Sequence, residues 1–355
     1  MAPRLRVALV GCGPISERHV LSWKAIPEVE LVAVCDRHPE NSARLASRHD
    51  IRKTYTDFHA LLSDVECNVV DIATRPYSHR ELVFLAARAG KNILCQKPFA
   101  PTLEEAREMI QACDEGKVRL MICENWRWFI WYQLIKQLLT EARIGDVCYF
   151  RMQLRNRFTI PHQSQPAAIT QDPQTYLQKM ERLLIYELAI HLLDVVRFLF
   201  GDPDSVYART GRMSPSVRGE DFALLVLNFG RMHGVIDASW CSRVPPESAK
   251  SEYLLIEGNA GSILLDQTGR IRVVDERGES EYPKYDWQGE TKLETHFRLH
   301  KHFVECILND QPFQTDGRDN IKTLEIALKA YESAAGNAVI ALQGDLLLSG
   351  RYAAE

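Results

Sequence analysis

The sequence predicts an α/β protein of two domains: a doubly wound parallel sheet, followed by an α+β domain with a large, mostly antiparallel open sheet. Short apolar runs alternate with amphipathic helical patterns up to about residue 123, and a glycine-rich turn follows the first run. After about residue 200, β-rich runs separated by turn residues dominate. We place the boundary after residue 123, which gives domains 1–123 and 124–355. A length of 355 residues suits two domains of moderate size.

The first domain is predicted from a regular alternation of apolar and amphipathic segments. We expect strands at residues 6–10, 31–35, 69–72, 92–95 and 120–123. Helical periodicity fills residues 16–25, 39–48, 78–89 and 103–115. Apolar strands joined by amphipathic crossovers require a parallel sheet that is covered on both faces.

The second domain begins with a helix at 132–141, a strand at 147–155, an irregular segment at 158–178 and a helix at 183–200. An irregular segment of this length is usually functional. The next β-like runs cover residues 205–209, 222–229, 233–240, 253–257, 262–266 and 271–274. Two helices, at about 292–309 and 319–342, complete a mostly antiparallel α+β domain.

Composition and charge narrow the class of protein. Hydrophobic residues make up 46% of the chain and the net charge is −4, which gives no sign of a nucleic-acid-binding surface. Nine cysteines without a C-x-x-C pair are typical of reduced thiols in a cytoplasmic protein. The most apolar stretch, 183–200, carries Glu187, His191, Asp194 and Arg197, so we expect a buried helix and no membrane span.

The glycine-rich turn predicts a dinucleotide-binding site of the Rossmann type. Residues 6–10 lead into Gly11-Cys12-Gly13-Pro14-Ile15-Ser16, which matches two glycines of G-x-G-x-x-G and places a serine at the third. Gly11 permits the turn, Gly13 lets a pyrophosphate approach the backbone, and a small residue at 16 allows close packing. A plain tight turn is the alternative, but the strand before and the helix after favour the cofactor.

Asp36 stands at the end of the second expected strand, followed by Arg37. A carboxylate at this place accepts hydrogen bonds from the adenosine ribose and repels a 2′-phosphate. NAD is therefore expected. Arg37 could attract a 2′-phosphate, so NADP is the less favoured alternative. An exposed strand-end acid or a cap for the helix at 39–48 remains the alternative for Asp36.

Beyond these motifs the sequence resembles the glucose–fructose oxidoreductase and inositol dehydrogenase (Gfo/Idh/MocA) family over nearly its whole length. The matching segments, in order after the glycine turn, are Thr74-Arg75-Pro76 with His79, Ala89-Gly90-Lys91, Cys95-Gln96-Lys97-Pro98, Ile144-Gly145-Asp146, the helix with His191 and Asp194, Glu257-Gly258-Asn259-Ala260-Gly261-Ser262, and Glu332-Ser333-Ala334. The resemblance implies a Rossmann domain and an α/β domain whose open sheet forms homodimers or homotetramers. It also implies cofactor contacts from Gly11, Gly13, Pro14, Ile15, Asp36, Arg37, Thr74, His79, Gln96 and Lys97.

Two positions depart from the family pattern. Gln96 stands where the family usually has glutamate, and Glu187 stands where it usually has aspartate, four residues before His191. Gln96 removes a negative charge next to Lys97. These departures leave the inherited substrate assignment open.

His191, Glu187 and Lys97 are the catalytic candidates. Oxidation of an alcohol needs removal of the hydroxyl proton, and the neutral imidazole of His191 is a suitable base. Glu187, one helical turn earlier, lies on the same face and would orient that imidazole. The resemblance places Lys97 at the substrate hydroxyl, where an ammonium group stabilises an alkoxide. The alternatives are a buried acid–histidine pair and a surface lysine.

Further candidates for substrate binding are Asn125, Arg127, Arg155, Tyr186 and Asp194. Arginines match carboxylates bidentately and so indicate a sugar acid. The tryptophans beside Asn125 and Arg127 are equally consistent with a core between domains, and Asp194 with a pair to Arg197. We expect no metal, because no second histidine or cysteine stands near Glu187, His191 and Asp194 in the sequence.

The residues together predict a cytoplasmic, NAD-linked dehydrogenase of a sugar, cyclitol or sugar acid. Two alternatives remain: an isomerase that recycles its NAD, since segments 95–101 and 124–127 resemble D-apionate oxidoisomerases, and a non-catalytic NAD-sensing regulator.

Overall fold

The computed structural model describes residues 5–162, 164–243, 252–282 and 291–342, which form two compact units. The first unit holds the described residues up to Trp128 and the segment Thr291–Leu324. The second holds the described residues of Phe129–Glu290 and of Glu325–Leu346. The sequence-based boundary after residue 123 lies close to the first crossing of the chain, but the return of 291–324 to the first unit was not predicted.

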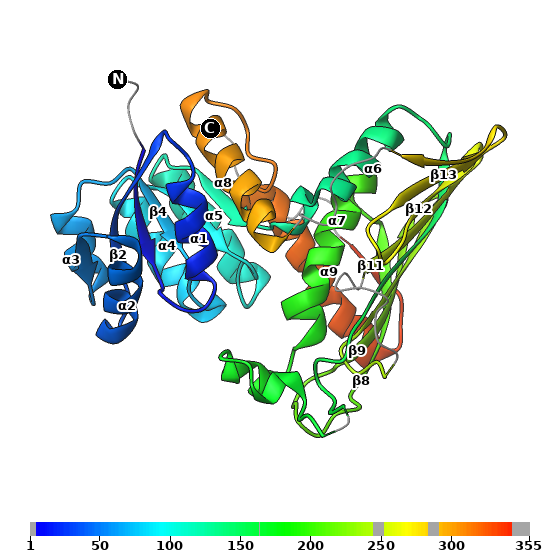
Figure 1. Cartoon of the computed structure of the whole chain (residues 1–355), viewed down its shortest axis with the longest axis horizontal. Coiled ribbons are helices and arrows are strands. Elements are labelled where there is room, and N and C mark those ends of the chain that lie inside the picture. The colour runs from blue at the N-terminus through cyan, green and yellow to red at the C-terminus, as the bar shows by residue number, and fades with distance from the viewer. Residues whose placement is uncertain (1–4, 163, 244–251, 283–290, 343–355) are drawn as a thin grey trace, which may run out of the picture. The chain divides into compact units, whose positions relative to one another are not determined.

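A six-stranded parallel sheet forms the centre of the first unit, shown in blue and cyan in Figure 1. Its strand order β3-β2-β1-β4-β5-β6 is that of a doubly wound dinucleotide-binding sheet. The strands are β1 (Leu5–Val10), β2 (Val29–Cys35), β3 (Lys53–Tyr55), β4 (Val69–Ile72), β5 (Asn92–Gln96) and β6 (Leu120–Cys123). The helices are α1 (Ser16–Lys24), α2 (Pro39–His49), α3 (Phe58–Asp64), α4 (His79–Arg88) and α5 (Leu103–Glu115). The predicted fold class of this unit is confirmed.

Helix α8 (Lys292–Leu308) explains why segment 291–324 belongs to the first unit. Its N-terminus carries a capping box in which Thr291 and Glu294 bond each other's backbone amides. Leu299 and Phe303 are fully buried in one apolar cluster with Trp23 of α1 and the β1 strand. These contacts join residues that are far apart in the chain, and no local pattern of the sequence predicts them.

A nine-stranded sheet forms the second unit, with the order β14-β13-β12-β11-β7-β10-β9-β8-β15. The β7–β10 ladder is parallel and the other ladders are antiparallel, as expected for a mostly antiparallel sheet. The strands are β7 (Val147–Arg155), β8 (Ser205–Gly211), β9 (Phe222–Phe229), β10 (Met232–Ser239), β11 (Glu252–Gly258), β12 (Gly261–Leu265), β13 (Ile271–Asp275), β14 (Gly278–Tyr282) and β15 (Ile340–Ala341).

One face of this sheet is covered by helices of the same unit. Helices α6 (Ile130–Thr140) and α7 (Ile190–Phe200) lie along it in Figure 1. Burial alternates along the strands: Phe150, Met152 and Leu154 of β7 are buried, whereas Arg151 between them is exposed. Helix α9 (Gly317–Gly336) contributes its first part to the first unit and its second part to this one.

The structure also describes the cysteines and the apolar helices. All nine cysteines lie in the described part of the chain and are free, and seven of them are buried. Among the described helices, none combines the length and apolar character needed to cross a bilayer.

Candidate active site

The glycine turn begins where β1 ends, at the carboxyl edge of the parallel sheet. Gly11 has φ +95°, and a Cβ there would lie 2.7 Å from the carbonyl oxygen of Ala73, so another residue does not fit. A Cβ at Gly13 would meet nothing within 4 Å, which leaves the backbone open to an approaching ligand. Ser16 donates its hydroxyl hydrogen bond to the Gly13 carbonyl as α1 begins. These are the features that a bound pyrophosphate requires.

Asp36 is fixed beside this turn by two backbone hydrogen bonds. Its Oδ2 accepts from the Cys12 amide at 2.8 Å, and its Oδ1 accepts from the His38 amide at 2.9 Å. Burial and the nearby Asp36 carboxylate raise the pKa of Cys12 to about 12. Arg37 is exposed, and its Nε contacts His38. A pocket beside the turn is lined by Cys12, Gly13, Pro14, Ser16, Glu17, Arg44, Leu45 and Arg48.

The ring of His79 contacts backbone carbonyl oxygens of two loops at the carboxyl edge of the sheet. The His79 ring is fully buried, and its nitrogens contact the carbonyl oxygens of Phe99 and Thr74 at 3.0 and 3.2 Å. Burial lowers the pKa of His79. Thr74 is half-buried and accepts a hydrogen bond from the Ser78 hydroxyl. His79 therefore joins the loop after β4 to the turn after β5.

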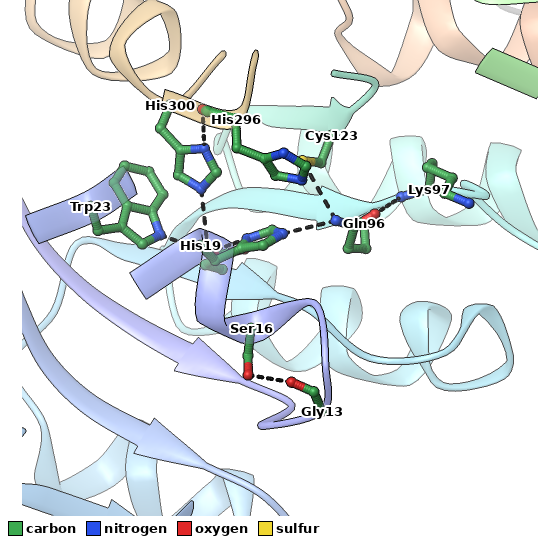
Figure 2. Close-up of polar contacts among 10 residues, drawn as sticks. Gly13, Ser16, His19, Trp23, Gln96, Lys97, Cys123, His296 and His300 are labelled. Carbon is green, nitrogen blue, oxygen red and sulfur yellow. Dashed lines mark hydrogen bonds and ion pairs between the residues drawn. The ribbon is translucent and has the colours of Figure 1, made fainter. Parts of the chain in front are cut away.

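Gln96 is the last residue of β5 and Lys97 follows it, at the same carboxyl edge of the sheet. Gln96 is buried, and its Oε1 accepts a hydrogen bond from the Lys97 amide at 2.9 Å. Its Nε2 lies 2.8 Å from Nε2 of His19 on helix α1 (Figure 2). Lys97 is half-buried and precedes Pro98 through a cis peptide bond.

A buried polar cluster lies behind Gln96, and the sequence interpretation missed it. His19 contacts Asp71 of β4 at 2.8 Å, and the Trp23 indole donates to the same carboxylate oxygen at 2.6 Å. His300 of α8 lies edge-on to Trp23, with ring centroids 4.3 Å apart. The signal for this cluster was an aspartate inside an apolar strand, together with histidines four residues apart on α8.

Burial alone would raise the pKa of the Asp71 carboxyl, but the short contact with His19 holds it below its usual range. Asp71 is therefore a buried carboxylate. Among the described residues, His19 approaches two sets of metal-ligand type, one with Cys123 and His296 and one with Asp71 and His300. Both ring nitrogens of His19 already make short contacts, with Asp71 and Gln96. A metal would have to displace one of them, so the residues fit a hydrogen-bonded cluster better.

In the second unit, the helix predicted at 183–200 begins with a π-helical turn, Ile185–Ala189, and continues as α7. Glu187 lies in the π turn and is half-buried, His191 lies in the first turn of α7 and is buried, and Asp194 is fully buried. A π turn holds more residues than an α turn, so the interval from Glu187 to His191 is less than one full turn. The sequence pattern gave no sign of this change.

The start of this helix is held by Glu220, another residue that the sequence interpretation missed. The Glu220 carboxylate accepts hydrogen bonds from the backbone amides of Leu183 and Ile185 at 3.1 and 2.9 Å. Tyr331 donates its hydroxyl to the same carboxylate at 2.6 Å and accepts from the Tyr186 amide at 3.2 Å. Predicted residue Tyr186 thus lies next to the anchored end of the helix.

Three predicted substrate ligands are engaged in contacts within their own units. Arg155 binds Asp237 of β10 with two guanidinium nitrogens, the shortest distance being 2.7 Å. Asn125 donates to Thr295 at 2.6 Å, and Arg127 is buried and donates to the Gln314 carbonyl at 3.1 Å. The tryptophans at 126 and 128 are buried as well, so this segment packs as core of the first unit.

The doubly wound sheet, the glycine turn and the strand-end acid define a two-domain protein of the nicotinamide-dinucleotide-binding oxidoreductase class. Residues 5–123 match the oxidoreductase family with an NAD-binding Rossmann fold, and residues 132–264 match the GFO/IDH/MocA C-terminal domain. The chain belongs to the Gfo/Idh/MocA family, as the sequence resemblance predicted.

The relatives agree with this assignment. The chain is 34% identical over 348 residues to D-apiose dehydrogenase of Paraburkholderia graminis, covering 96% of this chain and 90% of that protein. It is 31% identical over 344 residues to D-apiose dehydrogenase of Rhizobium rhizogenes, covering 95% and 97%. A solved oxidoreductase from Agrobacterium radiobacter, in complex with NAD+, L-tartaric acid and magnesium, has a TM-score of 0.88 and 31% identity, covering 95% and 98%. The predicted enzyme class, an NAD-dependent dehydrogenase, is confirmed.

Proposed function

We propose that this chain oxidises a hydroxyl-bearing carbon of a sugar, cyclitol or sugar acid and transfers the hydride to NAD. The observation that carries the proposal is the carboxyl edge of the parallel sheet, where the glycine turn, Asp36 and Lys97 follow β1, β2 and β5. Open α/β sheets bind ligands at this edge. Two relatives are named for D-apiose, which makes that sugar the first substrate to test. The Agrobacterium structure contains a hydroxy diacid, so sugar acids come next.

The proposed reaction gives a role to the predicted catalytic residues and to two of the predicted substrate ligands. The bound nicotinamide would accept the hydride. Lys97 would donate a hydrogen bond to the substrate oxygen and stabilise its negative charge as the proton leaves. His191 would take that proton, with Glu187 orienting its ring and Asp194 and Tyr186 binding further hydroxyls. The same histidine would return the proton when the reaction runs toward the alcohol.

The test follows the absorbance of reduced nicotinamide with purified protein, NAD, and a panel of sugars, inositols and aldonates. We expect turnover with one substrate class. We expect Lys97→Ala to lower kcat about 10²- to 10³-fold, and His191→Ala about 10²- to 10⁴-fold. The exposed residues Lys301 and His59 provide the matched controls Lys301→Ala and His59→Ala, which should retain activity.

Two outcomes would contradict the proposal. Full activity in both Lys97→Ala and His191→Ala would exclude the assigned roles. Tight NAD binding without reduction of the cofactor would favour an enzyme that recycles its NAD, or a regulator, and mass spectrometry of the reaction mixture would separate these two by the presence or absence of product.

We also propose that the chain forms a homodimer or homotetramer through the exposed face of the nine-stranded sheet. The family resemblance implies this face, and Val226 of β9 and Val274 of β13 are exposed apolar residues on its strands. Sedimentation of the wild type and of Val226→Glu would test this, since a monomeric wild type contradicts the proposal.

A further inference from the structure

A line of buried polar side chains connects the interior of the first unit to the backbone of Lys97. It runs from Asp71 on β4 to His19 on α1 and then to Gln96 on β5, as Figure 2 shows for the part from His19 to Lys97. The three contacts measure 2.8, 2.8 and 2.9 Å. Asp71 and His19 are fully buried and Gln96 is 5% exposed. None of these side chains has a role in the proposed proton and hydride transfers.

The direction of every hydrogen bond in this line is determined from its Lys97 end. The Lys97 backbone N–H can only donate, so the atom of Gln96 facing it must be the amide oxygen. The Gln96 amide nitrogen therefore faces His19 and can only donate, which makes Nε2 of His19 an acceptor. A neutral imidazole that accepts at Nε2 carries its proton at Nδ1. That proton is donated to Asp71, which is a carboxylate.

The other groups that face His19 leave this pattern intact at neutral pH. His296 and His300 on α8 lie with ring centroids 5.5 and 5.0 Å from His19, and burial lowers the pKa of both. Both donate from Nδ1 to backbone carbonyls of α8. Burial raises the pKa of Cys123 on β6, so it stays a thiol. Arg18, the neighbour of His19 on α1, adds positive charge that faces His296.

We propose that His19 and Gln96 are positioning residues that fix the backbone of Lys97 at the end of β5. They act through an Asp71–His19–Gln96 hydrogen-bond line, which requires His19 to be neutral with its proton on Nδ1. The line explains why an amide suits position 96. An amide presents an acceptor to Lys97 and a donor to a neutral imidazole at once. The importance of position 96 for turnover rests on the proposed function of Lys97. The assignment of the His19 tautomer is independent of that function.

A carboxylate at position 96 changes the proton content of the line. The carboxylate introduced by Gln96→Glu would still accept from the Lys97 amide, but it has no hydrogen to donate to Nε2 of His19. Both contacts of His19 would survive only if its ring carried a second proton and became a cation between two carboxylates. Gln96→Glu therefore converts a support that needs a neutral His19 into one that is lost as pH rises and the added proton leaves. Gln96→Met, of similar size, removes both hydrogen bonds at every pH.

The first test reads the tautomer directly, by NMR of the full-length protein with nitrogen-15 in its histidine rings. His19 is assigned from the signals missing in His19→Gln. We expect the wild-type ring to be neutral and protonated at Nδ1 near pH 7, and the ring in Gln96→Glu to be protonated at both nitrogens. A wild-type His19 that is protonated at Nε2, or doubly protonated, would overturn the proposal, and it would do so even if no substrate were known.

The second test measures kcat, KM for NAD and the pH profile. We expect Gln96→Met to lower kcat about 10- to 100-fold with little change in KM, because the reacting group is misplaced. The kcat of Gln96→Glu relative to wild type should fall as pH rises. Asn92→Leu is the control, since Asn92 also accepts a backbone hydrogen bond but lies at the opposite end of β5.

The outcomes are separable. Unchanged kcat in Gln96→Met, together with a lowered unfolding midpoint, would reduce His19 and Gln96 to structural residues and overturn their positioning role. A parallel pH profile in Gln96→Glu and wild type would do the same. If the wild type reduces no NAD with any substrate, the proposed function fails, while the NMR result still decides the tautomer.

Discussion

Asp36 shows how a single side chain connects the fold to the choice of cofactor. Its carboxylate is placed beside the glycine turn by the amides of Cys12 and His38, so it has a fixed position before any ligand arrives. A fixed carboxylate accepts ribose hydroxyls and repels a 2′-phosphate. Arg37 is exposed and contacts the neighbouring His38, so it does not cancel that charge.

We expect Asp36→Ala to lower kcat/KM for NAD about 10- to 100-fold, because a charged hydrogen bond to the cofactor is lost. We also expect the ratio of kcat/KM for NAD to that for NADP to fall. Parallel initial-rate measurements with the two cofactors check this. Asp36→Asn keeps an acceptor for the Cys12 amide and should retain more NAD activity than Asp36→Ala. An unchanged ratio between the cofactors in both variants would show that Asp36 does not select NAD.

The contacts of individual side chains were the hardest feature to predict from the sequence. The glycines at 11 and 13 and Asp36 lie where their motif predicted, because the motif specifies a backbone geometry. Arg155 was expected to bind substrate, yet Asp237 on the neighbouring strand binds its guanidinium, and strand pairing cannot be deduced from one sequence. His19 was missed because its partners come from other elements of the unit.

At the scale of elements, the helix that carries Glu187 and His191 depends on a distant carboxylate. The first amides of a helix lack intrahelical partners, and a negative charge there also stabilises the helix dipole. Glu220, in the loop before β9, supplies both the hydrogen-bond acceptor and the negative charge. Tyr331 of α9 holds the Glu220 carboxylate in place. Burial and Glu220 raise the pKa of Tyr331 well above its usual value, so it remains a hydroxyl donor.

We expect Glu220→Gln to destabilise the protein by roughly 0.5–2 kcal/mol, since it removes the charge but keeps one acceptor. Glu220→Ala should destabilise it by about 1–3 kcal/mol, because buried amides lose their partner. Urea unfolding followed by circular dichroism measures both. Glu181→Gln is a control, since Glu181 is exposed and pairs with the exposed Arg218. Equal midpoints for Glu220→Ala and wild type would contradict the anchoring role.

The sequence predicted strands well where they are apolar throughout or alternate between apolar and polar residues. The predicted strands at 69–72, 120–123, 147–155 and 222–229 coincide with β4, β6, β7 and β9. The missed elements are β3, α3, β14 and β15. Strands β3, β14 and β15 lie at sheet edges, and the described side chains of β3 and β14 are mostly exposed. Short exposed segments lack the alternation of apolar and polar residues on which such predictions depend.

At the scale of the whole molecule, the return of segment 291–324 links the stability of the first unit to pH. Helix α8 brings His296 and His300 into the interior, where His79 is also buried. Burial lowers the pKa of all three rings, so each is neutral in the folded protein. In the unfolded chain each binds a proton below about pH 6.5. The folded state therefore loses stability as pH falls through that value, because the unfolded state takes up more protons.

We expect the free energy of unfolding to fall between pH 7.5 and pH 5.5 by roughly 1.4 kcal/mol for each histidine that stays neutral. Asp71 adds nothing to this change: its pKa is lowered in the folded state, so its stabilising contribution is present above about pH 4 and is lost only below that. His296→Gln keeps a donor for the Lys292 carbonyl and should flatten the pH dependence by about one proton, whereas the exposed His59→Gln should leave it unchanged. Urea titrations at both pH values measure the difference. Identical pH dependences for His296→Gln and wild type would mean that α8 does not hold its histidine neutral in the folded core.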